Sequence, residues 1–179
     1  WPWSSRSAAT PATATRRESS MRHLPKHLRP RWRYLAVGIE SWSDAEVGRR
    51  AFQRALWYAA GNLLGDAGSA DADLSLLSFT HGDGVGEAVV RVRRGHVDDA
   101  RAAVACVSAV DDEPVGLRVR GISGTVRACE ERYMGRATAS STQRDVAFGD
   151  AERVAVARRD ARDVRTESGR VGAAAFDIE

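Results

Sequence analysis

The side chains that resemble catalytic groups do not combine into a protein active site. Gly121-Ile122-Ser123-Gly124-Thr125 starts like the G-x-S-x-G elbow of serine hydrolases but lacks its final glycine. His23 and His27 have the i, i+4 spacing of metal ligands, yet Pro25 between them disfavours a regular helix, and no thiol or acidic group lies nearby. We therefore expect no catalytic residue and no metal ligand in this chain.

Neighbouring carboxylates leave one alternative open, which is a Mg²⁺ site. Adjacent acidic side chains at 98–99 and 111–113 could supply the oxygen ligands that this ion prefers. Both groups flank a segment with helical spacing, where surface acidic residues are common. A solvated role is therefore favoured for them, as it is for His81 in a turn and His96 at a helix start.

Basic charge is concentrated at two places along the chain. The chain has 27 basic and 24 acidic side chains, for a net charge of +3. Residues 1–33 carry +7 and residues 118–144 carry +4, whereas residues 34–117 carry −6. This asymmetry favours an anionic partner, and nucleic acid is the first candidate. Because no stretch approaches the ~20 apolar residues of a membrane-spanning helix, we expect a soluble protein without a membrane partner. A cytoplasmic location is also expected.

Arginine supplies nearly all of the positive charge, since Lys26 is the only lysine in the sequence. This bias is typical of a GC-rich genome, and with the acidic middle segment it is compatible with a salt-loving organism. The screening length falls to ~3 Å in molar salt, so phosphate binding there would depend on close bidentate arginine contacts.

Hydrophobic periodicity predicts the element order βαββαβ followed by one further helix. The expected strands are 34–39, 73–80, 87–94 and 115–122, and the expected helices are 44–64, 96–110 and a last one that carries Val126, Cys129 and Tyr133. This order indicates an α+β fold, a ferredoxin-like and RRM-like sandwich with a four-stranded antiparallel sheet and an added helix after strand four. Strands one and three would be central, with strand four beside strand one.

Local signals set the limits of the first expected helix. Ser43 and Glu46 have the spacing of a capping box, and Gly65 with Gly68 is expected to end the helix. Five residues are expected to lie near one face of this helix. These are Val47, Ala51, Ala55, Tyr58 and Ala59.

The second face of the predicted sheet favours RNA if it is open. With Leu35, Val37 and Ile39 turned to the helices, that face would hold small residues and Tyr34 between two arginine rows. The rows are Arg91 with Arg93 and Arg118 with Arg120. An ordinary solvated face and a face covered by the following helix are the alternatives.

The ends of the chain differ in composition from the domain expected at 21–135. Residues 1–20 are rich in Ser, Thr, Ala, Pro and Arg, so we expect a disordered extension. We expect the authentic chain to start at Met21, with a transit peptide as the alternative. Residues 136–179 are expected to be a polar, weakly structured extension whose alternating fragments could be short strands.

Two runs resemble the archaeal ribonuclease P protein component 2 family, which is shared with eukaryotic ribonuclease P and MRP subunits. The first is MRHLPKHLRPRWRYLAVGIE at 21–40, and the second is RVRGISGTVRACEERY at 118–133. Their order and separation resemble the family pattern over roughly residues 21–135. Members from haloarchaea are similar in having acidic, arginine-containing ends.

This resemblance implies a subunit of the ribonucleoprotein that removes the 5′ leader of precursor tRNA. The RNA of that enzyme is the catalyst and uses Mg²⁺, and the protein itself binds no cofactor. The implied partners are ribonuclease P RNA, precursor tRNA as the substrate, other ribonuclease P proteins, and protein component 3, with which the family forms a heterotetramer. A free-standing RNA-binding or regulatory domain is the competing hypothesis, and a small-molecule enzyme comes third.

Charge and motif together predict the RNA contacts. They are Arg22, Lys26, Arg29, Arg31 and Arg33 near the start, and Arg118, Arg120, Ser123, Thr125 and Arg127 near the last turn. Glycines and hydroxyls before a helix can offer N–H groups to a phosphate, although a simple capped helix start is favoured on these residues alone. Tyr34 could stack on a base or serve the core. On the second strand, Leu77 and Phe79 are expected to share a face, opposite Leu74 and Leu76, and to contact a protein partner.

Overall fold

A computed structural model describes Pro25 and residues 27–135, 143–149, 151–157, 162–167 and 169–174. The chain divides into two compact units, Trp1–Arg31 and Trp32–Glu179. In the first unit a turn is closed by the Leu28 N–H, which donates to the Pro25 carbonyl at 2.9 Å. No helix within the described ranges is long and apolar enough to cross a membrane.

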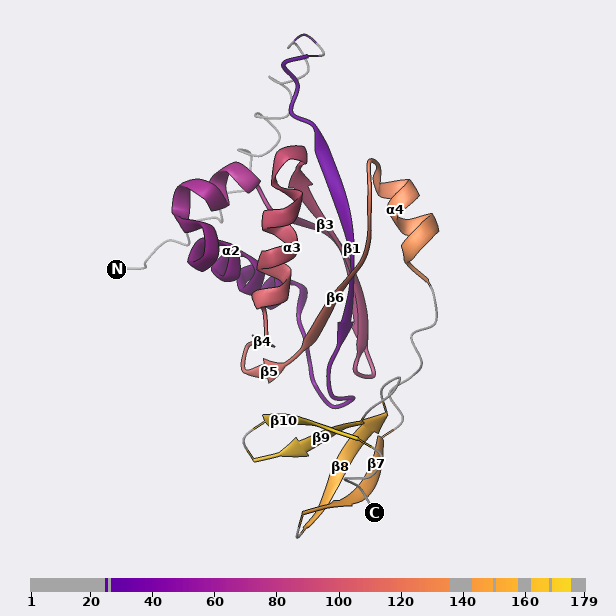
Figure 1. The fold of residues 1–179 in the computed structure, drawn as a ribbon. Coiled ribbons are helices and arrows are strands. Elements are labelled where there is room, and N and C mark those ends of the chain that lie inside the picture. Colours follow the sequence, from indigo (N-terminus) through magenta and orange to yellow (C-terminus); the bar gives the residue numbers. More distant parts are fainter. Residues whose placement is uncertain are drawn as a thin grey trace, which may run out of the picture. The chain divides into compact units, whose positions relative to one another are not determined.

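Four antiparallel strands form the main sheet of the second unit (Figure 1). They are β1 (Trp32–Glu40), β2 (Ser75–Gly82), β3 (Val85–Arg93) and β6 (Gly116–Ser123). Their order is β2-β3-β1-β6, and each neighbouring pair is antiparallel. The predicted mixture of helices with an antiparallel sheet is thus confirmed, and β1 and β3 are the central strands as expected.

Two helices cover one face of this sheet, and a third lies on the other face (Figure 1). Helices α2 (Arg49–Ala72) and α3 (Val97–Cys106) enclose the main core, whereas α4 (Val126–Tyr133) packs on the opposite side. Val97, Ala100, Val104 and Val107 all contribute to the main core, as the spacing predicted. Fully buried side chains from both layers, such as Leu35 and Phe52, make up its centre.

The start of α2 differs from the prediction. The helix begins at Arg49 with Gly48 as its N-cap, which has no side-chain cap hydrogen bond, so the capping box at Ser43 and Glu46 is wrong. The preceding segment is held elsewhere: the Ser41 N–H donates to the Gly84 carbonyl at 2.8 Å, and Trp42 is buried. Tertiary contacts therefore determine the backbone where the local signal predicts a helix.

The rest of α2 also departs from the prediction in two respects. The helix continues to Ala72, with a break at Gly65, whose φ is 70°. Phe52, Leu56 and Ala60 form the fully buried stripe, at i, i+4 and i+8. Tyr58 lies away from this stripe and is 72% exposed, so it does not lie on the buried face of the helix.

Strand β2 contains a bulge that changes which side chains share a face. Its pairing with β3 shifts between Leu76 and Ser78, which leaves Leu77 as the extra residue. Phe79 packs against the main core, where its ring centroid lies 5.3 Å from that of Phe52. Leu77 instead packs with the α4 side of the sheet. The predicted common face of Leu77 and Phe79 is therefore wrong, and the two do not form a partner surface.

The acidic residues near 111 belong to a hairpin turn. Short strands β4 (Ala109–Val110) and β5 (Glu113–Pro114) pair with each other, and the two residues between them have positive φ. Asp111 and Asp112 occupy these turn positions, which aspartate tolerates better than most side chains. Asp111 also accepts a hydrogen bond from Arg54 at 3.0 Å.

The segment beyond α4 includes a second antiparallel sheet. Its strands are β7 (Gln143–Phe148), β8 (Ala151–Ala157), β9 (Arg162–Thr166) and β10 (Gly169–Ala173), in the order β10-β9-β8-β7. Val146, Ala155, Val164 and Ala173 are buried together. The alternating fragments of this region are thus strands in the described part of the chain.

A partly buried histidine at the β2–β3 hairpin is expected to make stability depend on pH. Ser41 Oγ donates to the Trp42 carbonyl at 3.0 Å and lies 2.9 Å from His81 Nε2. Since the hydroxyl has one proton, His81 Nε2 is the donor to Ser41. Burial lowers the pKa of His81 below its usual 6.5, because the charged ring loses solvation.

We expect the free energy of unfolding to decrease as the pH falls below about 6.5. In that window the unfolded chain takes up a proton at His81 that the folded protein disfavours, so the unfolded state gains stability. Urea unfolding at pH 7.5 and pH 5.5 should show the decrease in the natural protein and a smaller one in His81→Gln, since glutamine can still donate to Ser41. An equal decrease in both proteins would contradict the assignment to His81.

Candidate nucleic-acid interface

The Gly121–Thr125 turn has a local structural explanation. Thr125 is the N-cap of α4, and its side-chain oxygen accepts a hydrogen bond from the Ala128 N–H at 3.2 Å. A Cβ added to Gly121 would lie 2.3 Å from the ring of Tyr133, so this glycine gives the tyrosine room to pack on the strand. The structure thus shows a capped helix start, and phosphate binding by the turn stays a prediction.

Helix α4 covers the middle of the second sheet face. Its Cys129 is fully buried with Ala36 and Val89, and Tyr133 packs against them. The Cys129 thiol donates to the Tyr34 carbonyl at 3.5 Å, and burial, with the nearby Glu130 charge, raises the pKa of this thiol. The expected open face is therefore covered at its centre by the following helix, one of the alternatives that the sequence allowed.

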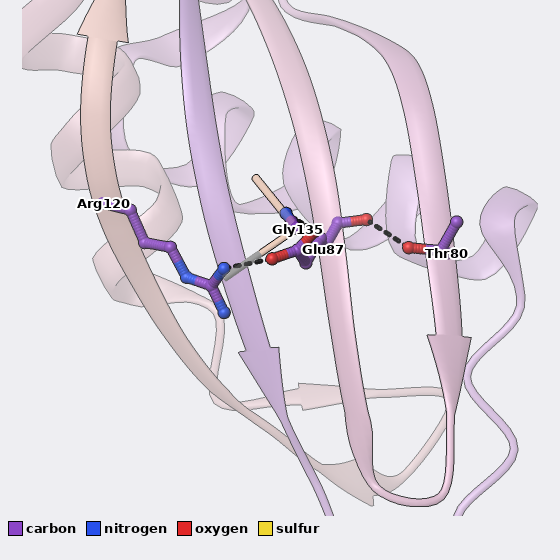
Figure 2. Close-up of polar contacts among 4 residues, drawn as sticks. All are labelled: Thr80, Glu87, Arg120 and Gly135. Atoms are coloured by element: carbon purple, nitrogen blue, oxygen red, sulfur yellow. Dashed lines mark hydrogen bonds and ion pairs between the residues drawn. The ribbon is translucent and has the colours of Figure 1, made fainter. Parts of the chain in front are cut away.

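Glu87 joins the sheet to the residue after the end of α4 (Figure 2). One carboxylate oxygen of Glu87 on β3 is hydrogen-bonded to the Arg120 guanidinium, and the other accepts the Gly135 N–H at 3.0 Å. The side chains of Arg120 and Glu87 are only 12% and 19% exposed. Arg120 lies against Gly38, where an added Cβ would be 2.6 Å from its Nε.

Arg120 lies at a bulge in β6. On β1, Ala36 pairs with Gly121 but Val37 pairs with Val119, so Arg120 is the extra residue of β6. Its guanidinium is held by the Glu87 carboxylate, which competes with any phosphate. Arg118 is exposed and lies opposite Gly38 in the register.

The other predicted RNA contacts fall into three groups. Arg22 and Lys26 lie outside the described residues. Arg29 and Arg31 are exposed and belong to the first unit. Near the β6–α4 turn, Arg33 Nη1 donates to the Trp32 carbonyl at 3.0 Å and would lie 3.9 Å from a Cβ on Gly124.

The last of these groups also includes the residues of the β6–α4 turn. Ser123 is paired with Tyr34 in the register, and Thr125 is exposed. The side chain of Arg127 is 89% exposed and donates to Glu131 at 2.6 Å. The structure thus brings Arg33, Ser123 and Thr125 to one end of the sheet, whereas Arg118 and Arg120 lie farther along the face.

Three residues at the same end of the sheet were not among the predicted contacts. Trp32 pairs with Arg93 across the β1–β3 ladder, and Arg91 pairs with Tyr34. The Arg91 guanidinium carbon lies 4.2 Å from the centre of the Trp32 ring. Alternation did place both arginines on this face, but Trp32 precedes the predicted start of the strand. A strand extended by two residues would have included it.

Acidic, histidine and cysteine side chains do not gather into a group of three that could hold a metal ion in the described ranges. The second unit also has a surface on which arginine and aromatic side chains lie together. Such a surface can neutralise phosphates and stack on bases.

Comparison with known proteins identifies the family of the chain. A family model for the Rpp14/Pop5 family matches residues 33–134. The chain belongs to the Rpp14/Pop5 family. The matched range extends from the second residue of β1 to the first residue after α4, and it excludes the second sheet.

Curated members of this family cover most of the chain. Ribonuclease P protein component 2 of Halorubrum lacusprofundi is 80% identical over 159 residues, which are 89% of this chain and all of the relative. The protein of the same name from Natronomonas pharaonis is 60% identical and covers 88% of this chain and 98% of the relative. That of Methanosarcina acetivorans is 32% identical, over 64% of this chain and 82% of the relative.

A solved structure of yeast ribonuclease MRP contains a chain with 18% identity and a TM-score of 0.41, covering 54% of this chain and 76% of that one. The Rpp14/Pop5 family match and the names of the curated relatives together support a ribonuclease P protein subunit.

Proposed function

We propose that this ribonuclease P subunit binds the catalytic RNA of the enzyme and so supports removal of the 5′ leader from precursor tRNA. The observation that carries this proposal is the 80% identity to ribonuclease P protein component 2 over that relative's whole length. The RNA supplies the catalytic groups and uses Mg²⁺, and the protein holds no cofactor of its own. Its contribution is to neutralise phosphates, which lowers the Mg²⁺ concentration that RNA folding and cleavage require.

The arrangement of charge supports RNA binding. Exposed arginines lie in both of the segments that carry excess positive charge, among them Arg31, Arg118 and Arg127. Guanidinium groups bind phosphate oxygens in pairs, so they retain short-range contacts where salt screens long-range attraction. The free-standing RNA-binding domain is the second candidate, because the same surface would serve it.

The proposal extends to architecture and partners. The strand order and the two helices on one face support a ferredoxin-like sandwich, here assigned to residues 21–135. The resemblance to the family implies protein component 3 as a partner within a heterotetramer, other ribonuclease P proteins, and a cytoplasmic location. Purification of the tagged chain from its own cells tests the partners. Co-purification of the catalytic RNA and of component 3 is expected, and a bare monomer would favour the free-standing domain.

Replacing both Arg31 and Arg33 by alanine should weaken binding to the catalytic RNA and raise the Mg²⁺ requirement of cleavage. Each phosphate contact changes the slope of log affinity against log salt by about one, so the double variant should reduce the magnitude of this slope by about two. Filter binding over a salt series measures the change.

The matched control for this double variant is Arg54→Ala with Arg101→Ala, which removes two exposed arginines from α2 and α3. We expect the control to keep the natural slope and the natural Mg²⁺ dependence. The assignment fails if the Arg31 and Arg33 variant behaves like this control.

A further inference from the structure

We propose that the Trp32 end of the second sheet face binds a single-stranded segment of RNA on a stacking platform made by Trp32, Tyr34, Arg91 and Arg93. The inference rests on the proposed function, since it names the surface that contacts RNA. It adds three residues, Trp32, Arg91 and Arg93, to those predicted from charge and motif.

The platform occupies two neighbouring rows of the sheet. In the first row Trp32 of β1 is opposite Arg93 of β3, and in the second Tyr34 is opposite Arg91. Because residues two apart in a strand point to the same side, all four side chains share the face on which α4 lies. The second row continues to Ser123 on β6 and to Ser75 on β2. Arg91 Nη2 donates to the Ser75 hydroxyl at 3.5 Å, so the platform extends across the sheet.

Among the described residues, the hydrophobic cluster of α4 includes Tyr34 but not Trp32, Arg91 or Arg93. The fully buried contacts of α4 are with Ala36 and Val89, one row farther along, and Tyr34 packs at the edge of the same cluster. After the helix, the Gly135 N–H donates to Glu87. The helix therefore runs away from the platform, and its first residues follow directly after Ser123. Trp32, Tyr34, Arg91 and Arg93 are half-buried, which leaves part of each open to solvent.

The chemistry of the four side chains fits a nucleotide. The Arg91 guanidinium carbon lies 4.2 Å and that of Arg93 6.0 Å from the centre of the Trp32 ring, so two cationic groups lie near one aromatic ring. Bases stack on aromatic rings and on guanidinium planes, and guanidinium donors bind phosphates. Paired bases are already stacked within a helix, so an unpaired segment is the form of RNA that such a platform accepts.

Arg93 has hydrogen-bonding capacity left over. Its Nη2 is 3.9 Å from the nearest Asp73 carboxylate oxygen, which is beyond hydrogen-bond distance. Its Nε is buried and has no hydrogen-bond acceptor among the described residues. The rest of the Arg93 side chain is accessible, at 43% exposed, so a phosphate oxygen can reach the guanidinium from solution. The positive charge of the platform favours RNA over an apolar protein surface.

Binding of a labelled oligouridylate of about ten nucleotides tests the proposal. Trp32→Ala should weaken binding about tenfold, since stacking contributes ~1–3 kcal/mol per base. Arg91→Gln with Arg93→Gln should reduce the magnitude of the salt slope by about 1.4, as expected for two single-strand phosphate contacts. A duplex of the same length should bind the natural protein more weakly and should not respond to Trp32→Ala.

Matched controls separate the platform from general effects. Tyr58→Ala removes an exposed aromatic ring from α2, and Arg101→Gln removes an exposed charge from α3, so both should bind like the natural protein. Trp32→Phe keeps an aromatic ring and should retain most of the affinity. This variant shows whether the loss in Trp32→Ala comes from the missing ring or from a change in the fold. Crosslinks from 5-iodouridine should map to the peptide that holds Trp32 and Tyr34.

The outcomes are distinct. Platform variants that bind oligouridylate like the controls, with crosslinks elsewhere, would overturn the platform even if the natural protein still binds catalytic RNA, and the proposed function would stand. Loss of component 3 binding with unchanged RNA affinity would show a protein interface instead and would also overturn it. Failure of the natural protein to bind the catalytic RNA at all would contradict the proposed function itself.

Discussion

Glu87→Ala is expected to lower the free energy of unfolding by about 3 kcal/mol and to release the end of α4 from the sheet. The Glu87 carboxylate joins Arg120 of β6 to the Gly135 N–H after α4, and both charged side chains are largely buried (Figure 2). Truncation to alanine leaves the buried Arg120 guanidinium without this carboxylate. It also leaves the Gly135 N–H without this acceptor. Desolvation makes such a loss larger than that of a surface ion pair.

Denaturant unfolding and amide hydrogen exchange test this prediction. Glu131→Ala is the matched control, because Glu131 pairs with Arg127 on the exposed side of α4 with side chains 60% and 89% exposed. That control should change stability by less than about 0.5 kcal/mol. In Glu87→Ala the amides of α4 should exchange faster, while those of α3 follow the global stability. Equal stability of the two variants would show that the ion pair does not hold α4.

Phe52→Ala should produce the largest loss of stability from a single core substitution, about 3–5 kcal/mol. Phe52 is fully buried on α2 and meets Phe79 of β2 at 5.3 Å between ring centroids, so it joins helix to sheet. Truncation removes apolar area and leaves a cavity that a close-packed core fills only in part.

The matched control for Phe52 is Tyr58→Ala on the same helix, because Tyr58 is 72% exposed. Urea unfolding should place this control within about 0.5 kcal/mol of the natural protein, since it removes little buried area. A loss in Phe52→Ala no larger than in Tyr58→Ala would contradict the observed position of the core stripe.

Periodicity predicts the elements of the main sheet because alternation survives wherever a strand pairs regularly. Leu35, Val37 and Ile39 are buried as their spacing predicted, and so are Ala100 and Val104 of α3. The start of α2 could not be found in this way. Ser41 and Trp42 are held by contacts with the distant β2–β3 turn, and such contacts override a capping signal.

Bulges account for the errors within the strands. A single extra residue reverses the alternation, so Phe79 points to the core while Leu77 packs under α4. The bulge after Ala36 in the β1–β6 pairing leaves Arg120 as the extra residue of β6, but Arg120 stays on its predicted face, beside Gly38 and Glu87. Sequence patterns do not mark a bulge, because both registers keep plausible side chains on each face.

The sequence predicted which types of side chain form the candidate site, but it predicted their positions only in part. Arg91, Arg93 and Arg118 do lie on one sheet face, and the Ser123–Thr125 turn follows at its end. Coverage of this face by the following helix was one of the alternatives, and Cys129 and Tyr133 of α4 do pack on it. The sequence did not show how much of the face α4 covers. The extent of this contact determines that Ala36 is buried, while Trp32 and Arg91 are only half-buried.

Cleavage of precursor tRNA at low Mg²⁺ tests the central claim most directly. The assay combines the organism's ribonuclease P RNA with protein component 3, with and without this chain, in salt matched to the cytoplasm. The proposed function predicts a large gain in cleavage rate when the chain is added, and a loss of that gain as Mg²⁺ is raised. No gain at any Mg²⁺ concentration, with all components folded, would contradict a role in supporting the catalytic RNA.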